Sequence, residues 1–342
     1  MHIDSWVEEI PFKQPFSISG RTLTGQSVLR VRARHAGIEA HAEAAGIFYR
    51  GDTGHSMLRQ VQEVLPRLHD ERDDLHARWG VVHAMPAGGA RNALDWAMWQ
   101  LVAGVRRQPV HELAFLPLLR PVSTMITLGL ASASRMAEAA LAYPTARLLK
   151  LKLEGTLEDA ERVAAVRRER PDVRLAIDAN EGWTMEHLDH MMGTLLIHRV
   201  DLIEQPLPAG RDAELAQYQS PIPLAADESL QTLADLDAVA QRYRVANIKL
   251  DKCGGLSAAL TLGSAARQRG LQVMIGCMGG RSMAILPAFI AAQTADLADL
   301  DGPLIVAQDS EPSARYSNGC VSFDADELAA MARPAAPVSA WA

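Results

Sequence analysis

Short apolar runs that end in a charged residue recur through the middle of the chain, at intervals of 22 to 26 residues. One strand and one helix of a β/α barrel together take about that many residues. The pattern therefore predicts consecutive barrel strands over five segments: 148–152, 174–178, 200–204, 223–227 and 245–249.

Three further runs bring the number of predicted strands to eight, the number in a (β/α)8 barrel: Thr124 to Leu128, Gln272 to Gly276 and Asp296 to Asp301. Helical stretches lie between the runs, and several follow a hydroxyl residue that fits an N-cap. The expected caps are Thr156 before 157–168, Thr184 before 185–197 and Ser257 before 258–269. A barrel of this kind carries its active site at the C-terminal ends of its strands.

The first 120 residues have a different pattern. Val28 to Arg34 alternates between apolar and polar positions, which is typical of a half-buried antiparallel strand, and helical segments follow at Ser56 to Leu68 and Gly89 to Val105. We expect an α+β capping domain over 1–120, joined by the C-terminal tail over about 308–342, and a barrel over 121–307. Two loops, Ser17 to Gln26 and Ala44 to Thr53, are expected to close on the substrate.

The composition excludes several classes of partner. A net charge of −7 argues against nucleic acid and anionic membranes, and 48% hydrophobic residues in 342 suffice for a large core. The three cysteines are too few for a disulfide framework. The first residues lack the pattern of a signal peptide, and no apolar stretch is long enough to span a membrane. We expect a cytoplasmic protein, and the sequence leaves open whether it is a homo-oligomer.

The charged residues that end the five runs point to a metal site between two bases. Asp178, Glu204 and Asp227 are hard oxygen ligands of the kind that Mg²⁺ prefers. Lys152 and Lys249 end the strands on either side, so they should approach a metal-bound substrate from opposite faces. Such a pair can remove a proton from a carbon next to a carboxylate and return one on the other face, while the cation stabilises the enediolate.

Two further lysines, Lys150 and Lys252, lie close to these strand ends but are not expected to be the acid or the base. Lys150 lies two residues before Lys152 on the same strand face, where its charge would lower the pKa of Lys152 and attract a substrate carboxylate. Lys252 falls in the turn after the strand and is assigned no role. Each charged strand end, taken singly, could also be a helix cap or a solvated residue. All five at barrel spacing are much harder to obtain in that way.

Five sequence motifs resemble the enolase superfamily, muconate-lactonizing subgroup, and in particular its dipeptide epimerases. They are Lys150-Leu151-Lys152, Asp178-Ala179-Asn180, Glu204-Gln205-Pro206, Ala226-Asp227-Glu228-Ser229 and the stretch from Asn247 to Gly255. The likeness also takes in Ala90 to Asp95 and Asp299 to Pro303. It implies a Mg²⁺-dependent isomerase that interconverts dipeptides such as L-Ala-D-Glu and L-Ala-L-Glu. Lys152 and Lys249 would be its acid/base pair and the three carboxylates its metal ligands.

The resemblance also implies residues that bind the dipeptide. Asp299 and Asp301 match an Asp-x-Asp that holds the α-ammonium group in dipeptide epimerases. Arg21 lies where members of the family meet the distal side chain, and a guanidinium suits a γ-carboxylate. Thr127 and Cys277 end the first and seventh barrel strands and should line the pocket. For Cys277 an apolar wall is favoured over a nucleophile, because no histidine lies near it in the sequence.

Two alternative functions remain open at this stage. An N-acylamino acid racemase or o-succinylbenzoate synthase would share the lysines and metal ligands but would have no need of Asp299 and Asp301. A catalytically silent barrel that binds peptides would have no need of the two lysines. The stretches Glu39 to Ala44 and Gly276 to Ser282 depart from the usual family pattern, so the dipeptide could differ from Ala-Glu.

Overall fold

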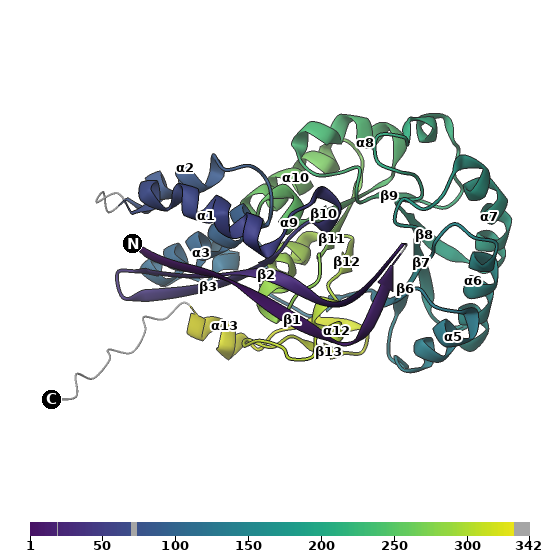
Figure 1. Ribbon diagram of the computed structural model, residues 1–342, viewed down its shortest axis with the longest axis horizontal. Helices are drawn as coiled ribbons and strands as arrows, with labels where there is room; N and C mark the ends of the chain where they lie inside the picture. Colours follow the sequence, from purple (N-terminus) through teal and green to yellow (C-terminus); the bar gives the residue numbers. More distant parts are fainter. Residues whose placement is uncertain (19, 70–73, 332–342) are drawn as a thin grey trace.

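The computed structural model describes residues 1–18, 20–69 and 74–331 and contains a barrel beneath an antiparallel sheet (Figure 1). The barrel sheet has the strand order β12-β11-β10-β9-β8-β7-β6-β5, all parallel. The amide of Met125 donates to the carbonyl of Ala298 at 2.9 Å, which links the first and last strands. The predicted (β/α)8-type architecture with an N-terminal α+β unit is therefore confirmed.

The barrel strands coincide closely with the apolar runs. They are β5 (Ile126–Leu128), β6 (Leu148–Lys152), β7 (Arg174–Asp178), β8 (Val200–Glu204), β9 (Leu224–Ala226), β10 (Val245–Lys249), β11 (Gln272–Gly276) and β12 (Leu297–Asp299). The helices after them are α5 (Ala133–Leu141), α6 (Glu158–Glu169), α7 (Met185–Ile197), η2 (Ala213–Gln217), η3 (Leu233–Asp235), α8 (Leu236–Arg242), α9 (Leu250–Cys253), α10 (Leu256–Gln268), α11 (Ser282–Ala291), η4 (Ala292–Thr294) and α12 (Gly302–Ile305).

One of the three expected helix caps is confirmed and two are wrong. The Thr184 side chain accepts from the amide of His187 and caps α7. Helix α6 begins one residue later than expected, after Leu157, and Thr156 instead accepts from the Arg162 guanidinium. Helix α10 begins after Gly255, so Ser257 lies inside it and donates to Asp95. The Thr156 hydroxyl is taken by a side chain of the helix that it was expected to cap, and the Ser257 hydroxyl by a residue 162 positions away.

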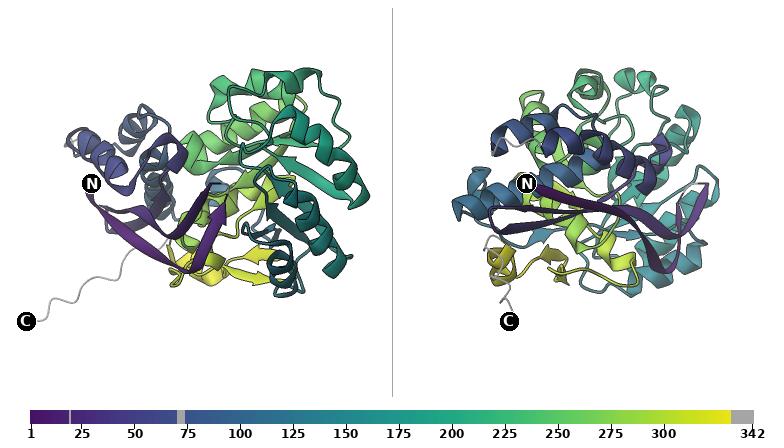
Figure 2. Two further views of the ribbon diagram at one scale, coloured as in Figure 1. Left: turned by 45° about the vertical axis from the view of Figure 1, so that its right-hand side comes forward. Right: turned by 60° about the vertical axis from the view of Figure 1, so that its left-hand side comes forward.

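The N-terminal part is a three-stranded antiparallel sheet with helices on it. Its elements are β1 (His2–Ile18), β2 (Arg21–His35), β3 (Ile38–Ala45), η1 (Phe48–Arg50), α1 (Gly54–Leu68), α2 (Leu75–His83), α3 (Gly89–Arg106) and α4 (Val110–Leu113). The hairpin of β1 and β2 extends from this part across to the barrel (Figures 1 and 2). Most of the first expected loop, 17–26, is therefore strand, because the hairpin ladder runs from Ile18–Arg21 back to His2–Arg34.

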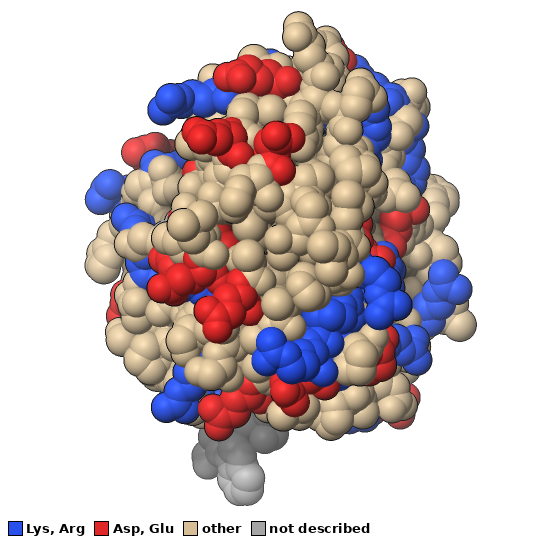
Figure 3. All heavy atoms as spheres, turned by 90° about the vertical axis from the view of Figure 1, so that its right-hand side faces the viewer, with Lys and Arg blue, Asp and Glu red and all other residues tan. Residues whose placement is uncertain are grey.

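The chain returns to the start of the barrel after α12. Strand β13 (Arg315–Ser317) pairs with β14 (Cys320–Ser322), which in turn pairs with β4 (Val122–Ser123), and α13 (Ala325–Met331) follows. Residues 332–342 of the expected C-terminal tail lie outside the described part of the chain. No helix in the described residues is long and apolar enough to cross a membrane. On the face that carries the outer barrel helices, acidic and basic side chains are interspersed rather than gathered into one basic area (Figure 3).

Helix α3 fixes the capping domain against the barrel. Its Asn92 donates to Asp251 at 2.9 Å, and its Asp95 accepts from the amide of Ser257 at 3.0 Å. The turn between them approaches so closely that a Cβ on Gly255, at φ +117°, would lie 2.5 Å from the Asp95 carboxylate. The motif 90–95 thus docks the two domains and is not part of the catalytic chemistry.

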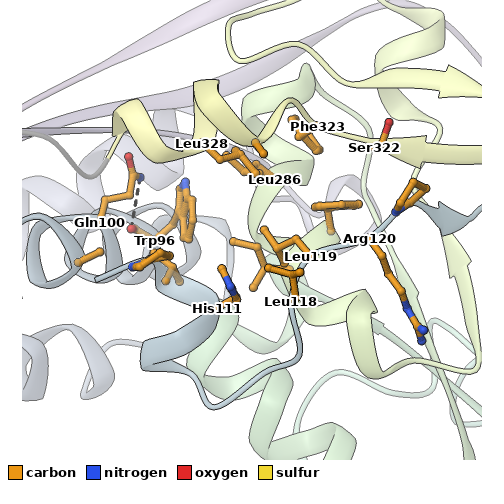
Figure 4. Close-up of a pocket in the computed structure, with 17 residues that line it drawn as sticks. Trp96, Gln100, His111, Leu118, Leu119, Arg120, Leu286, Ser322, Phe323 and Leu328 are labelled. Atoms are coloured by element: carbon orange, nitrogen blue, oxygen red, sulfur yellow. Dashed lines mark hydrogen bonds between the residues drawn. The ribbon is translucent and has the colours of Figure 1, made fainter. Parts of the chain in front are cut away.

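A cavity of about 360 Å³ lies away from the barrel mouth, between α3, α11 and α13 (Figure 4). Trp96, Leu286, Phe289 and Leu328 are among the residues that line it. Among the described residues its lining contains no carboxylate and no lysine, so these residues offer neither ligands for a hard cation nor an acid/base pair. The chemistry predicted from the strand ends belongs to a different cavity.

Candidate active site

A cavity of about 300 Å³ opens at the C-terminal ends of the barrel strands and is roofed by the β1–β2 hairpin and the segment around η1. Barrel residues on its floor include Lys150, Lys152, Asp227, Lys249 and Asp299. Lysine occurs at only five positions in the chain, and four of them lie in or beside this cavity. The concentration of one residue type at one place argues for chemistry over surface solvation.

The two-residue period of the strands puts these side chains inside the barrel. Leu148, Ala176, Leu202, Val245 and Met274 belong to one buried cluster in the interior. The next inward positions are two residues further along each strand, toward the C-terminal end. The strand register then aligns Lys152 with Asp178 and Glu204 on one side and Lys249 with Gly276 and Asp299 on the other.

The three predicted metal ligands are almost completely buried, and all of them are bonded to protein groups. The exposed fractions of Asp178, Glu204 and Asp227 are 0%, 0% and 1%. Asp178 accepts from Lys152 at 2.6 Å, and Glu204 accepts from Asn247 at 2.8 Å. Within the described residues, no three His, Cys, Asp or Glu side chains already surround one point as ligands. A cation would therefore bind by taking over oxygens that now accept from lysine and amide groups.

The electrostatics of the carboxylates fit a divalent cation. Burial, together with the nearby charge of Asp178, raises the pKa of Glu204 to about 7. A carboxylate in this position is held next to like charge in a low dielectric, and a bound cation would relieve that cost. The donor set consists of oxygens alone, which suits Mg²⁺ better than a transition metal.

The two lysines proposed as acid and base each contact a different carboxylate. Lys152 donates to Asp178 at 2.6 Å and Lys249 donates to Asp227 at 2.7 Å. Burial alone would lower the pKa of Lys249, but Asp227 and Glu204 outweigh it and hold the pKa well above its ordinary value. A cation shared by those carboxylates would weaken their hold on the lysine proton, as a base at this position requires.

Lys150 and the residues at the end of β12 form one connected group. Lys150 donates to Asp299 and lies 3.4 Å from Glu204. Asp301 accepts from the amide of Thr127 at 2.5 Å, and burial, with the charge of Asp299, raises the pKa of Asp301 to about 6. The other oxygen of Asp299, Oδ1, is buried without a partner in the described structure. It is therefore free to accept from a cationic group of a ligand.

Of two further residues expected at the site, Cys277 lines the cavity and Arg21 does not. Cys277 lines the pocket, and burial, with the charges of Asp299 and Asp301, raises the pKa of its thiol to about 12. It is a neutral wall residue rather than a nucleophile. Arg21 is not among the lining residues; its exposed side chain lies over the ring of Phe48, 5.2 Å from the ring centroid.

Sequence reasoning missed Lys252 and Asn247. Lys252 is 1% exposed and donates to Asp227 Oδ1 at 2.6 Å, which leaves that carboxylate between two lysines. Asn247 orients Glu204, and a Cβ on Gly276 would lie 2.6 Å from the Asn247 side chain. The signal for Asn247 was present, since it lies two residues before Lys249 and shares its inward face. Lys252 reaches the site only because α9 turns back toward the strand.

An ion-pair cluster joins the N-terminal sheet (β1 to β3), which forms the lid over the barrel, to the loop after β11. Glu43, whose side chain is fully buried, accepts from the backbone amide of Arg281 at 2.9 Å and from its guanidinium at 2.8 Å. The same guanidinium donates to Glu8 at 2.8 Å. The acid of the capping sheet, which the family pattern shares, and the arginine of the barrel loop, which departs from that pattern, are thus partners of each other.

Arg281→Met should destabilise the protein by about 3 kcal/mol, because the buried Glu43 carboxylate keeps the backbone amide of residue 281 but has only a long contact to Arg30 as its counter-charge. The free energy of unfolding in urea measures this loss. The double variant Glu43→Gln/Arg281→Met removes both charges and should recover more than half of the lost stability. A single variant as stable as wild type would show that the cluster does not hold the lid in place.

Comparisons with known proteins agree with this geometry. Residues 130–326 match the family model described as enolase C-terminal domain-like. The L-Ala-D/L-Glu epimerase of Escherichia coli (strain K12) is 37% identical over 316 residues, which cover 91% of this chain and 96% of that protein. The N-acetyl-D-glutamate racemase of a Pseudoalteromonas species is 42% identical over 242 residues, with coverage of 71% and 76%.

A solved structure is similar over nearly the whole chain. It is that of an enolase family member from Agrobacterium tumefaciens with homology to dipeptide epimerases, with bound sodium and L-Ala-L-Glu. Its TM-score is 0.88 at 34% identity, and the alignment covers 95% of this chain and 98% of that one. The likeness therefore takes in the lid as well as the barrel.

Proposed function

We propose, because the chain belongs to the enolase C-terminal domain-like family, that it is a Mg²⁺-dependent dipeptide epimerase. The reaction is a 1,1-proton transfer that inverts the α-carbon of the C-terminal residue of a dipeptide. The observation that carries this proposal is the placement of Lys152 and Lys249 on either side of buried carboxylates, in a cavity that also contains the Asp299 carboxylate with its free oxygen.

Asp178, Glu204 and Asp227 are the residues that would hold Mg²⁺. Sites of the enolase superfamily use a Lys or His base together with Mg²⁺, as is generally known of the class. When bound, the cation supplies positive charge to the substrate carboxylate and so stabilises the enediolate that forms when the α-proton leaves. Asn247 and Lys252 hold Glu204 and Asp227 in place for this task.

The two lysines move the proton. With the α-carbon between them, the neutral lysine on one face takes the α-proton at its Nζ, and the protonated lysine on the other face donates a proton from its Nζ. The reverse reaction exchanges the two roles. Lys150 lies between Asp299 and Glu204 and adds positive charge beside the substrate carboxylate.

The N-terminal ammonium group of the dipeptide would be bound by Asp299 and Asp301. Both carboxylates line the cavity, and Asp299 Oδ1 has no partner within the described residues. Lys150 is the one cation beside these two buried carboxylates in the described structure, and a cation of the ligand would balance the second negative charge. This pair favours a free dipeptide over an N-acylated amino acid, whose amide carries no charge.

An N-acylamino acid racemase is the second candidate, because the N-acetyl-D-glutamate racemase is 42% identical over 71% of the chain. The same lysines and ligands would serve it. At the end of β12 a dipeptide epimerase must recognise an ammonium group and a racemase an N-acyl group. Comparing a free dipeptide with an N-acetyl amino acid as substrates therefore separates the two functions. A silent peptide-binding barrel would predict no turnover of either substrate.

Asp301→Asn should lower kcat/KM for a free dipeptide by about 100-fold, because it removes one of two charges that face the ammonium group. Activity on the matching N-acetyl amino acid should stay the same or rise. The assay is epimerisation of both substrates with Mg²⁺ present. Asp296→Asn is the matched control, since Asp296 precedes the same strand and lies outside the cavity.

A proportional loss of both activities would mean that Asp301 supports the site in general and does not select the amine. Wild-type protein that turns over N-acetyl amino acids better than dipeptides would favour the racemase.

A further inference from the structure

The roof of the active-site cavity carries a group of apolar side chains. Phe16 and Leu23 are directly opposite each other in the β1–β2 hairpin, and both line the cavity. Ile18, two residues after Phe16, faces the same way, and Phe48 adds an aromatic ring from η1. The barrel side of the cavity carries all three lysines of the lining, and the roof side adds no cation: its polar lining residues are Gln26, Ser27, Tyr49, Asp52 and Thr53.

The C-terminal side chain of a bound dipeptide must point toward this roof. The proposed function places its α-carbon between Lys152 and Lys249 and its carboxylate over the three strand-end carboxylates. The N-terminal residue runs toward Asp299. These three directions use the barrel floor and its β12 side, so the side chain on the α-carbon is left to meet the hairpin and η1.

The described lining of the cavity offers an acidic side chain no cation that lacks a carboxylate partner. Among the lining residues in the described part of the chain, the only cations are Lys150, Lys152 and Lys249, and each is already bonded to a carboxylate. A glutamate side chain in this space would lose its water without gaining a counter-charge, which is costly. An unbranched apolar side chain of the same length would gain from the same group of apolar side chains.

Arg21 is the residue that could alter this conclusion. It lies two residues before Leu23 on the same strand face, nearer the hairpin tip, and its guanidinium lies over the ring of Phe48. Its side chain is exposed to water and does not line the cavity. The residue on this strand face that lines the cavity is Leu23.

We propose that this enzyme acts on dipeptides whose C-terminal residue is apolar and discriminates against acidic ones, with Leu23 as the residue that sets the preference. The inference rests on the proposed function and adds the class of side chain. The names of relatives do not decide the side chain, since two of them specify glutamate and two others, each 35% identical, read hydrophobic dipeptide epimerase.

The test is a set of three substrates of nearly equal length: L-Ala-L-Met, L-Ala-L-Gln and L-Ala-L-Glu. Epimerisation of each is measured as kcat/KM with Mg²⁺ at neutral pH. We expect L-Ala-L-Met to exceed L-Ala-L-Glu by about 100-fold, with L-Ala-L-Gln between them. The glutamine substrate separates the effect of charge from that of polarity.

Three variants locate the preference. Leu23→Arg should lower the Met-to-Glu ratio at least about 10-fold, because it puts a guanidinium into the roof. Thr24→Arg adds the same charge one residue along, on the opposite strand face, and should leave the ratio unchanged. Arg21→Gln should also leave it unchanged.

The possible outcomes distinguish failure of the substrate preference from failure of the proposed epimerase function. Preference of the wild type for L-Ala-L-Glu, lost in Arg21→Gln, would overturn the inference and assign the charge to Arg21, while the proposed function would stand. An equal shift in Leu23→Arg and Thr24→Arg would overturn the role of Leu23. Absence of turnover for all three dipeptides would instead count against the proposed function itself.

Discussion

Lys249→Ala should abolish epimerisation, with a loss of about 10⁴-fold, yet still exchange the α-proton of one epimer with solvent. The reason is geometric: each lysine faces one side of the α-carbon, and Lys152 keeps its contact to Asp178 when Lys249 is removed. Lys152→Ala should show the opposite selectivity. Exchange is followed by mass spectrometry of each epimer in deuterium oxide.

Lys13→Ala provides the control for this pair, because Lys13 is the one lysine outside the site and donates only to the carbonyl of Leu304 among the described residues. It should keep full activity. If either active-site variant retained epimerisation at the wild-type rate, that lysine would not be an essential acid or base. If both variants exchanged the same epimer, the lysines would not lie on opposite faces.

Glu204→Gln should remove Mg²⁺ binding and turnover together. The variant keeps the shape of the side chain but loses the charge at the centre of the three carboxylates, on which both the cation and the enediolate depend. Mg²⁺ titration by calorimetry and the epimerisation assay should both fall to background. Glu214→Gln, on the exposed part of η2, is the matched control.

The same variant should cost the metal-free fold little. Burial and Asp178 raise the pKa of Glu204 to about 7, so above pH 4.5 the folded state holds this proton more tightly than the unfolded chain does. Ionisation of Glu204 therefore reduces stability as the pH rises from 4.5 toward 7, and a neutral glutamine avoids that loss. In EDTA at pH 8 the variant should unfold at or above the wild-type denaturant midpoint. Full turnover in EDTA, or unchanged Mg²⁺ affinity in the variant, would contradict the ligand assignment.

The barrel could be predicted from the sequence because its signal is local. Each strand is an apolar run that ends in one charged residue, and the two-residue period alone decides that Lys150 and Lys152 face inward. The Thr184 cap is local in the same sense. Such features need no knowledge of where the chain travels next.

The lid and its contacts could not be predicted in this way, because they join distant parts of the chain. Glu43 and Arg281 are 238 positions apart, and neither shows in its own segment that it is buried against the other. The segment 17–26 contains glycine and hydroxyl residues that favour a loop, and only pairing with β1 makes most of it a strand. The same tertiary context turns Leu23 toward the cavity and Arg21 toward Phe48.

The most direct test of the central claim is epimerisation of a dipeptide such as L-Ala-L-Met in deuterium oxide with Mg²⁺, sampled in the first few per cent of reaction. Two-base transfer predicts that the product of inverted configuration carries one deuterium at the C-terminal α-carbon, while the recovered substrate remains largely protiated. A product that retains its original α-hydrogen, or deuterium at the N-terminal residue instead, would contradict proton transfer between Lys152 and Lys249.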